Sequence, residues 1–311
     1  MSPLHPQVRH LVATLATRPP AAPWEVPITA YREAGERLAA LAGPPDDGCA
    51  VTDLTIPVRR GSVDARRYRP PGQTVGPAVL YLHGGGFVRG SLDSHDRLCR
   101  ALCVRGGLGV VAVAYRLAPE NRFPAAHDDA LDALRWVSEH AGELSIDVTA
   151  LAVAGDSSGG MLAAATALAT RSGGPPLKAQ GLVCPALDAT MSSGSVDRYH
   201  AGPILTREAL AWSYDQYIPD TDDRRSARAS PLFEENLADA PPAIIISAQI
   251  DPVADDARRY AAALAAAGVA VDTHEYAGMP HSFVLLTGML EDGDHALTTF
   301  ATGLAELLNS G

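Results

Sequence analysis

The sequence has few cysteines, no long hydrophobic run and no excess of basic residues. Its four cysteines, at positions 49, 99, 103 and 184, are scattered; Cys99 and Cys103 are one helical turn apart, and no second pair completes a zinc-type set. We therefore expect reduced, mostly buried cysteines and no metal site. No apolar run approaches the ~18 residues of a membrane span. A formal net charge of −11 argues against nucleic acid and anionic membrane surfaces as partners.

The composition is typical of a soluble globular protein. The chain has 311 residues, long enough to bury a large core, and 47% of them are hydrophobic against 20% charged. The stretch from Arg9 to Thr17 faintly imitates a signal peptide, but its apolar part is short and Arg18-Pro-Pro follows directly, which favours an amphipathic helix. These features predict a cytoplasmic protein with no stable membrane anchoring.

Hydrophobic periodicity predicts an α/β fold. Two helices, Pro6 to Thr17 and Ile28 to Leu41, precede a hairpin of two strands, Val51 to Arg59 and Ser62 to Arg69. Strands are then predicted at 78–82, 110–114, 151–154, 181–184, 243–250 and 269–275, and helices at 94–105, 125–140, 161–170, 254–267 and 292–308. This alternation indicates a mostly parallel central sheet flanked by helices on both faces. It stops between about Asp188 and Ala240, a stretch without an apolar strand, which indicates an inserted helical segment.

The chain is organised around the run Leu151-Ala-Val-Ala-Gly155-Asp-Ser157-Ser-Gly159-Gly160. It predicts a short apolar strand, an abrupt turn and an alanine-rich helix, with Ser157 at the centre of a G-x-S-x-G motif. Such a turn strains its central residue and lifts that side chain clear of the sheet. Gly155 and Gly159 suit it because backbone segments approach too closely there for side chains. The helix would direct its N-terminal amides at the serine, where negative charge develops in acyl transfer.

A serine nucleophile needs a base, and the base needs an orienting acid. In a parallel sheet both should follow the carboxyl ends of strands. Asp251 directly follows the strongest predicted strand, although a helix cap is an alternative role for it. Asp255 and Asp256 fall inside the helix start, where capping and the helix dipole explain them. Among ten histidines only His281 combines a loop, the right sheet edge and glycine and proline neighbours, while His200 in the insertion could also approach the pocket. The order Ser157, Asp251, His281 is that of α/β-hydrolases.

The run His83-Gly84-Gly85-Gly86-Phe87 follows the strand at 78–82. Consecutive glycines let backbone amides turn toward a substrate oxygen, and with the amide of Ser158 they would form an oxyanion hole. We expect His83 to organise this loop by hydrogen bonding. A dinucleotide-binding loop is the rival interpretation, but the glycines do not match G-x-G-x-x-G opening a helix. Four apolar or aromatic residues could line a pocket or cap, although ordinary packing is the simpler role: Phe87, Trp212, Tyr214 and Tyr217.

Several motifs together resemble the hormone-sensitive-lipase-like esterases, the bacterial family IV carboxylesterases. The match runs in order from about Pro77 to Phe283 and rests on His83-Gly-Gly-Gly86, Tyr115-Arg-Leu-Ala-Pro-Glu120, Phe123-Pro-Ala-Ala126, Gly155-Asp-Ser-Ser-Gly-Gly160, Asp251-Pro-Val-Ala-Asp-Asp256 and Pro280-His-Ser-Phe283. The family pattern assigns the oxyanion amides to Gly85, Gly86 and Ser158, with Gly84 shaping the loop. One departure is Ser158, where alanine is usual; its extra hydroxyl could adjust the pocket.

The resemblance implies an α/β-hydrolase core at 48–187 and 241–311 under a helical cap formed by residues 1–47 and by the insertion 188–240. It implies hydrolysis of short- to medium-chain acyl esters, a small-molecule ester as substrate and no cofactor. Relatives often pair through sheet edges or terminal helices, so a homodimer stays open. Two other functions also stay open: an amidase or peptidase on the same core, and a non-catalytic ligand-binding receptor, which would typically have lost one member of the Ser157, Asp251 and His281 set.

Overall fold

The fold is built on one eight-stranded sheet. The computed structural model describes residues 4–17, 21–39 and 42–310. The strands are β1 (Ala50–Val58), β2 (Gly61–Arg69), β3 (Gly76–Leu82), β4 (Gly109–Val113), β5 (Ile146–Asp156), β6 (Ala179–Val183), β7 (Ala243–Ile250) and β8 (Val271–Pro280). Their order across the sheet is β1-β2-β4-β3-β5-β6-β7-β8. The hairpin β1–β2 joins β4 in antiparallel fashion, and every pairing from β4 to β8 is parallel, which confirms the predicted mostly parallel sheet.

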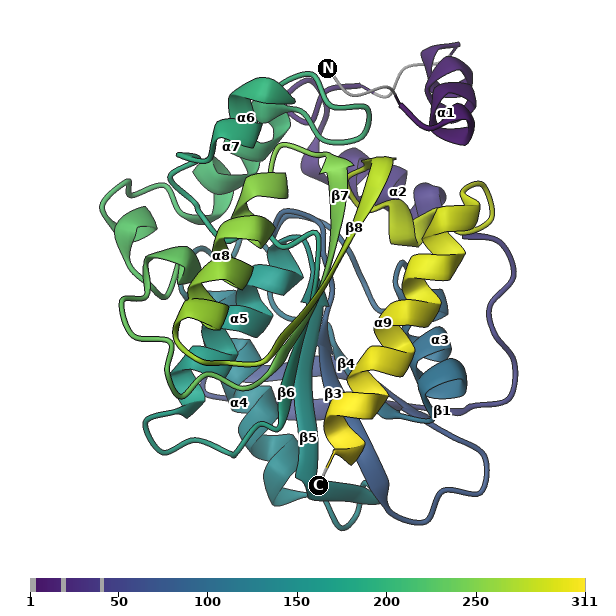
Figure 1. Cartoon of the computed structure of the whole chain (residues 1–311), viewed down its shortest axis with the longest axis vertical. Coiled ribbons are helices and arrows are strands. Elements are labelled where there is room, and N and C mark those ends of the chain that lie inside the picture. Colours follow the sequence, from purple (N-terminus) through teal and green to yellow (C-terminus); the bar gives the residue numbers. More distant parts are fainter. Residues whose placement is uncertain (1–3, 18–20, 40–41, 311) are drawn as a thin grey trace.

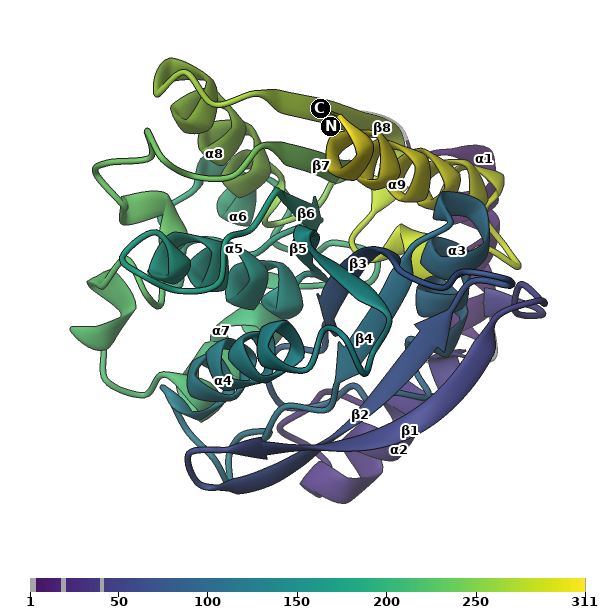
Figure 2. The same cartoon turned by 90° about the horizontal axis from the view of Figure 1, so that it is seen from below.

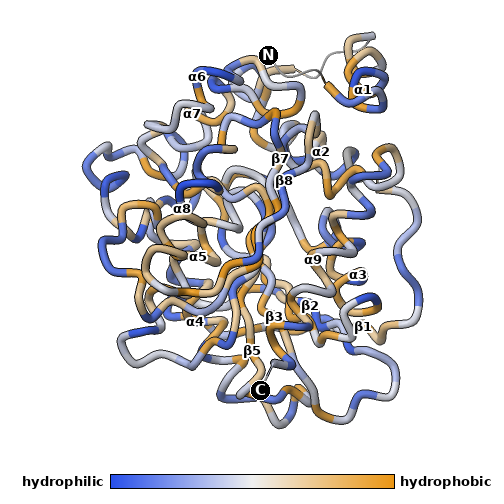
Figure 3. The backbone as a smooth tube through the Cα atoms, viewed as in Figure 1, coloured by the Kyte–Doolittle hydropathy of each residue, from blue (hydrophilic) through white to orange (hydrophobic). Residues whose placement is uncertain are grey.

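Helices cover both faces of this sheet, as the strand composition requires. Nearly all residues of strands β3, β4 and β6 are buried, and apart from Gln180 in β6 they carry no amide or charged side chain, because each strand faces helices on both sides. The helices α4 (Ala125–Glu139), α5 (Ser158–Thr170) and α8 (Ala254–Ala266) lie on one side, and α3 (Asp96–Gly106) and α9 (Glu291–Asn309) on the other (Figure 1; Figure 2 shows the same layers from below). In Figure 3 orange is concentrated along the inner strands and blue along the outer loops.

The remaining helices lie at one end of the sheet. These are α1 (Pro6–Ala16), α2 (Ile28–Ala39), α6 (Gly194–Arg198) and α7 (Arg207–Tyr217), with short 3-10 turns at Asp223–Arg225, Pro231–Phe233 and Phe283–Leu285. Figure 1 shows the four helices at the end where β7 and β8 finish, which is the end that carries the carboxyl termini of the parallel strands. The insertion contains no strand of the sheet, as its composition predicts.

The predicted elements are all present, with shifted bounds. The hairpin turns at Arg59–Arg60, one residue earlier than expected. Strand β5 begins at Ile146, and β8 runs from Val271 to Pro280, so it reaches further toward His281 than the prediction of 269–275. Positions 18–20, which follow the first predicted helix, and the last two residues of the predicted helix at 28–41 lie outside the described residues. Among the described helices, none has the length and apolarity needed to cross a membrane.

Candidate active site

Ser157 occupies the strained turn between β5 and α5. Its backbone has φ 55° and ψ −119°, which few residues other than glycine adopt. The surrounding backbone holds this conformation: the Ser157 amide donates to the Val183 carbonyl oxygen at 2.8 Å. A Cβ atom at Gly155 would lie 2.3 Å from the Gly159 carbonyl oxygen, and one at Gly159 would lie 2.0 Å from that of Leu82. Both glycines are therefore required by close backbone approach, as predicted.

Three side chains from three strand ends form one chain of hydrogen bonds. The Oγ atom of Ser157 lies 2.8 Å from Nε2 of His281. On the other side of the ring, Nδ1 of His281 lies 2.7 Å from Oδ2 of Asp251. The second carboxylate oxygen, Oδ1, accepts from the Val253 amide at 3.0 Å, which fixes the turn that precedes α8. Asp251 is fully buried and His281 is 5% exposed. The geometry thus brings Asp251 to His281, as predicted, while the N-cap position of α8 belongs to Val253.

The glycine loop follows β3, next to the serine turn. Strands β3 and β5 are neighbours, with Leu82 paired to Gly155. The strand that follows β3 in the sequence, β4, lies on its other side, so the order of strands reverses between β3 and β5. Ligands of α/β proteins bind at such switch points. Gly85 and Gly86 have φ values of 123° and 64°. Among the described residues none accepts a hydrogen bond from either of their amides, so both are available to a substrate oxygen.

Gly84 and His83 hold this loop in place through hydrogen bonds. The Gly84 amide donates to Oδ1 of Asp156 at 2.9 Å, and a Cβ atom there would lie 2.2 Å from the Asp156 carboxylate. Nδ1 of His83 lies 2.8 Å from the Gly84 carbonyl oxygen, and the His83 ring stacks on Tyr115 with centroids 4.3 Å apart. Burial, with a smaller contribution from His95, lowers the pKa of His83 to about 4. His83 is therefore neutral at pH 7 and serves as a loop support.

The buried network under the loop is a feature that sequence reasoning missed. Asp156 is 1% exposed and accepts from the Tyr81 hydroxyl at 2.7 Å, while Nε2 of His95 lies 3.2 Å from its Oδ1. Burial opposes ionisation of this carboxyl, but the neighbouring His95 and the Tyr81 hydrogen bond outweigh it and lower its pKa. The sequence offered one clue, since Asp156 lies inside the serine motif, yet its partners are 61 and 75 residues away.

Asp256 plays a role other than the one predicted. It lies in the first turn of α8 as expected, but its Oδ2 accepts from the amides of Leu187 and Asp188 at 2.9 and 3.2 Å, and Ser193 donates to its Oδ1. Burial raises the pKa of Asp256 to about 7, against these hydrogen bonds. The carboxyl thus ties the start of the insertion to the helix that follows Asp251. In the sequence, aspartates that follow a proline are typical of a helix start, and they do not indicate a contact with the amides of Leu187 and Asp188.

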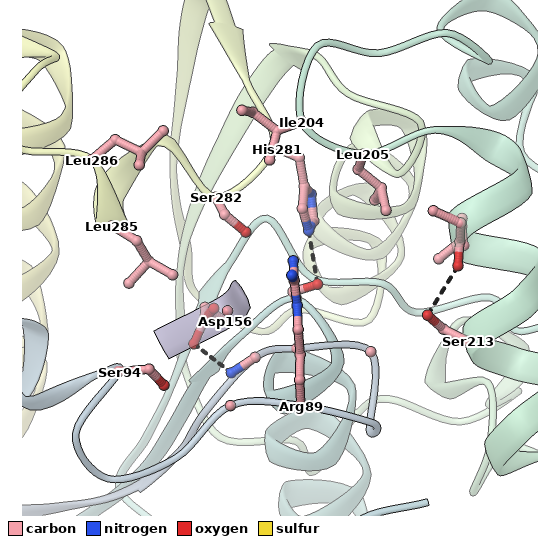
Figure 4. A pocket seen from close by; sticks show the side chains of 18 of the residues that line it. Arg89, Ser94, Asp156, Ile204, Leu205, Ser213, His281, Ser282, Leu285 and Leu286 are labelled. Atoms are coloured by element: carbon pink, nitrogen blue, oxygen red, sulfur yellow. Dashed lines mark hydrogen bonds between the residues drawn. The ribbon is translucent and has the colours of Figure 1, made fainter. Parts of the chain in front are cut away.

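The pocket above Ser157 is lined mainly by aliphatic side chains. They come from α1, from the insertion and from the segment after His281: Leu11, Leu15, Ile204, Leu205, Leu210, Leu285 and Leu286. Figure 4 shows Ile204, Leu205, Leu285 and Leu286 grouped around His281, with Arg89 extending from the glycine loop toward it. The polar lining residues, besides Ser157 and His281, are Arg89, Ser94, His95, Asp156, Ser213 and Ser282. The ligand surface therefore combines an apolar wall with a limited set of polar groups.

The four aromatic candidates pack outside this lining. Phe87, Tyr214 and Tyr217 are buried, and Phe87 stacks on Tyr217 with centroids 4.2 Å apart. Trp212 makes an edge contact with Tyr31, at 5.4 Å. Ordinary packing, the simpler of the two roles considered, is what these contacts show. His200 does not line the pocket; it is exposed and its Nδ1 lies 3.0 Å from the Asp197 carbonyl oxygen.

Cys184 lies close to Asp251 and His281, and one potential ligand atom from each lies within 4.8 Å of the others. The two ring nitrogens of His281 are already used by Ser157 and Asp251, so a metal ion would have to displace one of these bonds. Burial raises the pKa of the Cys184 thiol well above its usual value, with a further contribution from Asp251, so the thiolate that metals prefer is disfavoured. All four cysteines are free, and three of them are buried.

A serine on a sharp strand-to-helix turn, bonded to a histidine and an aspartate in that chain order, defines an α/β-hydrolase. The family model described as "alpha/beta hydrolase fold" matches residues 79–285. The ethyl acetate hydrolase of Pseudomonas putida is 41% identical over 285 residues, covering 90% of each chain. Esterase LipI of Mycobacterium tuberculosis is 41% identical over 264 residues, 83% of this chain and 82% of its own. The chain therefore belongs to the α/β-hydrolase family.

Solved structures agree with this assignment. An esterase from Pyrobaculum calidifontis superimposes with a TM-score of 0.91 at 39% identity, covering 99% of this chain and all of its own. A thermostable esterase from Pseudomonas putida ECU1011 gives a TM-score of 0.94 at 31% identity, covering 99% of both chains. The resemblance to hormone-sensitive-lipase-like esterases, predicted from the motifs, is confirmed.

Proposed function

We propose that this chain is a serine carboxylesterase that hydrolyses short- to medium-chain acyl esters through an acyl-enzyme on Ser157. The observation that carries the proposal is the continuous pair of hydrogen bonds, 2.8 Å from Ser157 to His281 and 2.7 Å from His281 to Asp251, at the floor of an apolar pocket. Relatives and structural neighbours named as esterases support the reaction class.

In the first half-reaction Ser157 Oγ attacks the ester carbonyl carbon while Nε2 of His281 takes the hydroxyl proton. Asp251, bonded to Nδ1, holds the ring in the tautomer that leaves Nε2 free to accept, and it stabilises the imidazolium that forms. The carbonyl π electrons move to oxygen, giving a tetrahedral oxyanion. When that intermediate collapses, the bond to the alcohol oxygen breaks, His281 returns the proton to the alcohol, and an acyl-Ser157 ester remains.

The oxyanion is held by the amides of Gly85, Gly86 and Ser158. The first two have no acceptor among the described residues, and Ser158 opens α5, where amides have no partner within the helix. Donors fixed before the reaction cost no reorganisation as charge develops, and each is worth about 3 kcal/mol in comparable sites. In the second half-reaction His281 takes a proton from water, the resulting hydroxide attacks the acyl carbon, and Ser157 leaves with that proton.

The helices at the carboxyl end of the sheet act as a cap that determines acyl length. Residues 1–47 supply Leu11, Leu15 and Tyr31 to the pocket, and the insertion 188–240 supplies Ile204, Leu205 and Leu210; residues 48–187 and 241–311 form the catalytic core. The free cysteines are consistent with a reducing compartment such as the cytoplasm. The chemistry is complete with side chains and water and requires no cofactor.

The test is a comparison of p-nitrophenyl esters from acetyl to palmitoyl with the matched p-nitroanilides. We expect turnover to peak at short or medium acyl length, and the anilides to be much poorer substrates. Labelling by a p-nitrophenyl phosphonate, located by peptide mass spectrometry, should fall on Ser157. Faster cleavage of anilides would make the enzyme an amidase, and absence of both turnover and labelling would indicate a binding protein; either result contradicts the proposal.

A further inference from the structure

Arg89 places a positive charge inside the pocket that holds Ser157 and His281. It lines that pocket with them, and Figure 4 shows its side chain extending from the glycine loop toward His281. Its stem packs over Gly85: a Cβ atom at Gly85 would lie 3.1 Å from the Arg89 Cγ. The cation therefore lies in the same pocket as the amides proposed to bind the ester oxygen.

The guanidinium of Arg89 has no counter-charge in the part of the chain that the structure describes. No carboxylate there lies within ion-pair distance of it and no acceptor takes a hydrogen bond from it; its one directed contact is with the Tyr31 ring, whose centroid is 4.7 Å from the guanidinium carbon. Neighbouring arginines differ. Arg32 pairs with Glu120 at 2.7 Å, and Arg116 with Asp129 at 2.6 Å.

The rest of the lining gives this charge nothing to bind. The one carboxylate among the lining residues, Asp156, is buried beneath the loop and is already bonded to Gly84 and Tyr81. The remaining lining residues carry no charge of fixed sign: they are leucines and one isoleucine, glycines, serines, Tyr31, Ala209 and two histidines. The N–H groups of the Arg89 guanidinium therefore have no protein acceptor in the described part of the pocket, where they are also less hydrated than at the surface. A planar carboxylate can accept two hydrogen bonds from a guanidinium at once, which makes it the best-matched ligand. The stacking on Tyr31 holds the side chain ready for such a ligand.

Resting on the proposed esterase function, we propose that Arg89 forms an anion subsite, and that the preferred substrates are esters carrying a free carboxylate, such as half-esters of short dicarboxylic acids. The overall net charge of −11 repels anions at long range. Selection is therefore made at the pocket itself, by a short-range charge-assisted contact with Arg89.

Two pairs of nearly isosteric esters test the subsite and locate the anion. Ethyl hydrogen succinate against ethyl levulinate places a carboxylate or a ketone on the acyl side. Acetoxyacetate against acetoxyacetone does the same on the alcohol side. We expect wild-type kcat/KM to favour the anionic member of at least one pair, and Arg89→Gln, which keeps most of the stem over Gly85, to reduce that preference about ten- to a hundredfold. Arg89→Lys should retain part of it.

The matched control is Arg37→Gln, which removes the same charge from the exposed surface of α2, the helix that carries Tyr31; Arg37 lies 3.9 Å from Glu33 there. It should leave the anionic-to-neutral ratio unchanged. A structural role for Arg89 would lower both members of a pair together. Absence of a preference in both pairs, or an unchanged ratio in Arg89→Gln, overturns the subsite. If the wild type hydrolyses none of the four esters, the esterase proposal fails instead; the neutral members separate the two outcomes.

Discussion

The hydroxyl of Ser158 accepts a hydrogen bond from the amide of Phe87 at 3.3 Å, joining the residue after the nucleophile to the glycine loop. The two sides of the proposed oxyanion hole, which follow β5 and β3, are therefore connected by a side chain at a position where alanine is usual. The expected adjustment of the pocket by this extra hydroxyl takes the form of a loop contact.

Ser158→Ala should have a small effect on catalysis and a measurable one on stability. The backbone amide that serves the hole remains, so we expect kcat to fall less than tenfold, but the buried Phe87 amide loses its acceptor, which costs about 1 kcal/mol or slightly more. Urea denaturation and steady-state kinetics of the same preparation measure both quantities. A loss of activity as severe as that of a nucleophile variant would contradict a purely supporting role for this hydroxyl.

Asp251→Asn should lower kcat by on the order of 10⁴-fold, because the asparagine side-chain N–H would donate to Nδ1 of His281 and stabilise the tautomer that carries its proton on Nε2, which then cannot take the serine proton. Asp255→Asn is the matched control: Asp255 lies four residues further on and its carboxylate pairs with Arg258 at the surface. It should retain near-normal turnover. Comparable losses in the two variants would argue that α8 as a whole, rather than the Asp251 carboxylate, supports catalysis.

Local turns and the positions of strand ends could be predicted from the sequence. Individual hydrogen bonds between segments that are distant in the sequence could not. The strand-to-helix turn at Ser157 is local, since Gly155 and Gly159 are required by the turn itself. The placement of Asp251 and His281 follows from the rule that parallel strands end at one edge. The Ser158–Phe87 bond and the contacts of Asp156 below Gly84 join groups that are 61 to 75 residues apart in the sequence, and hydrophobic periodicity does not predict such contacts.

The contacts of Arg32 are another feature that the sequence does not predict. On an N-terminal helix it looks like a solvated charge, yet Nε donates to the Val88 carbonyl oxygen at 2.8 Å and Nη2 to that of Ala118 at 2.9 Å, while the head pairs with Glu120. The side chain thus connects α2 to the glycine loop and to the turn after β4. Hydrophobic periodicity predicted the N-terminal helices, but their contacts with the core depend on the fold.

Arg32→Gln should therefore loosen α2 and the glycine loop together. We expect kcat/KM to fall about tenfold, the magnitude of losing charge-assisted hydrogen bonds of ~1.5 kcal/mol, and limited proteolysis to cut sooner within residues 21–39. The exposed Arg37→Gln variant controls for the charge. If proteolysis accelerates and kinetics stay unchanged, α2 does not support the loop in the way these contacts indicate.

His127 should make the protein less stable in mild acid. Burial, together with the charge of Arg228, lowers its pKa from 6.5 to about 3, so the folded state keeps it neutral while the unfolded chain binds a proton below pH 6.5. Stability from this group is complete above pH 6.5 and is lost as pH falls toward 3, with a slope approaching 1.4 kcal/mol per pH unit.

The prediction is tested with His127→Gln, because other groups, including Asp256 with its raised pKa, titrate in the opposite sense over part of this range. The difference in unfolding free energy between wild type and variant should shrink by about 2 kcal/mol from pH 7.5 to pH 5. A difference that is the same at both pH values would show that His127 binds its proton as easily in the folded state as in the unfolded one.

The most direct test of the account is the turnover of p-nitrophenyl butyrate by Ser157→Ala beside the wild type, after circular dichroism has shown both to be folded. Removing the hydroxyl that lies 2.8 Å from His281 should reduce kcat on the order of a millionfold. Turnover within tenfold of the wild type would contradict the assignment of Ser157 as the nucleophile, and with it the proposed reaction.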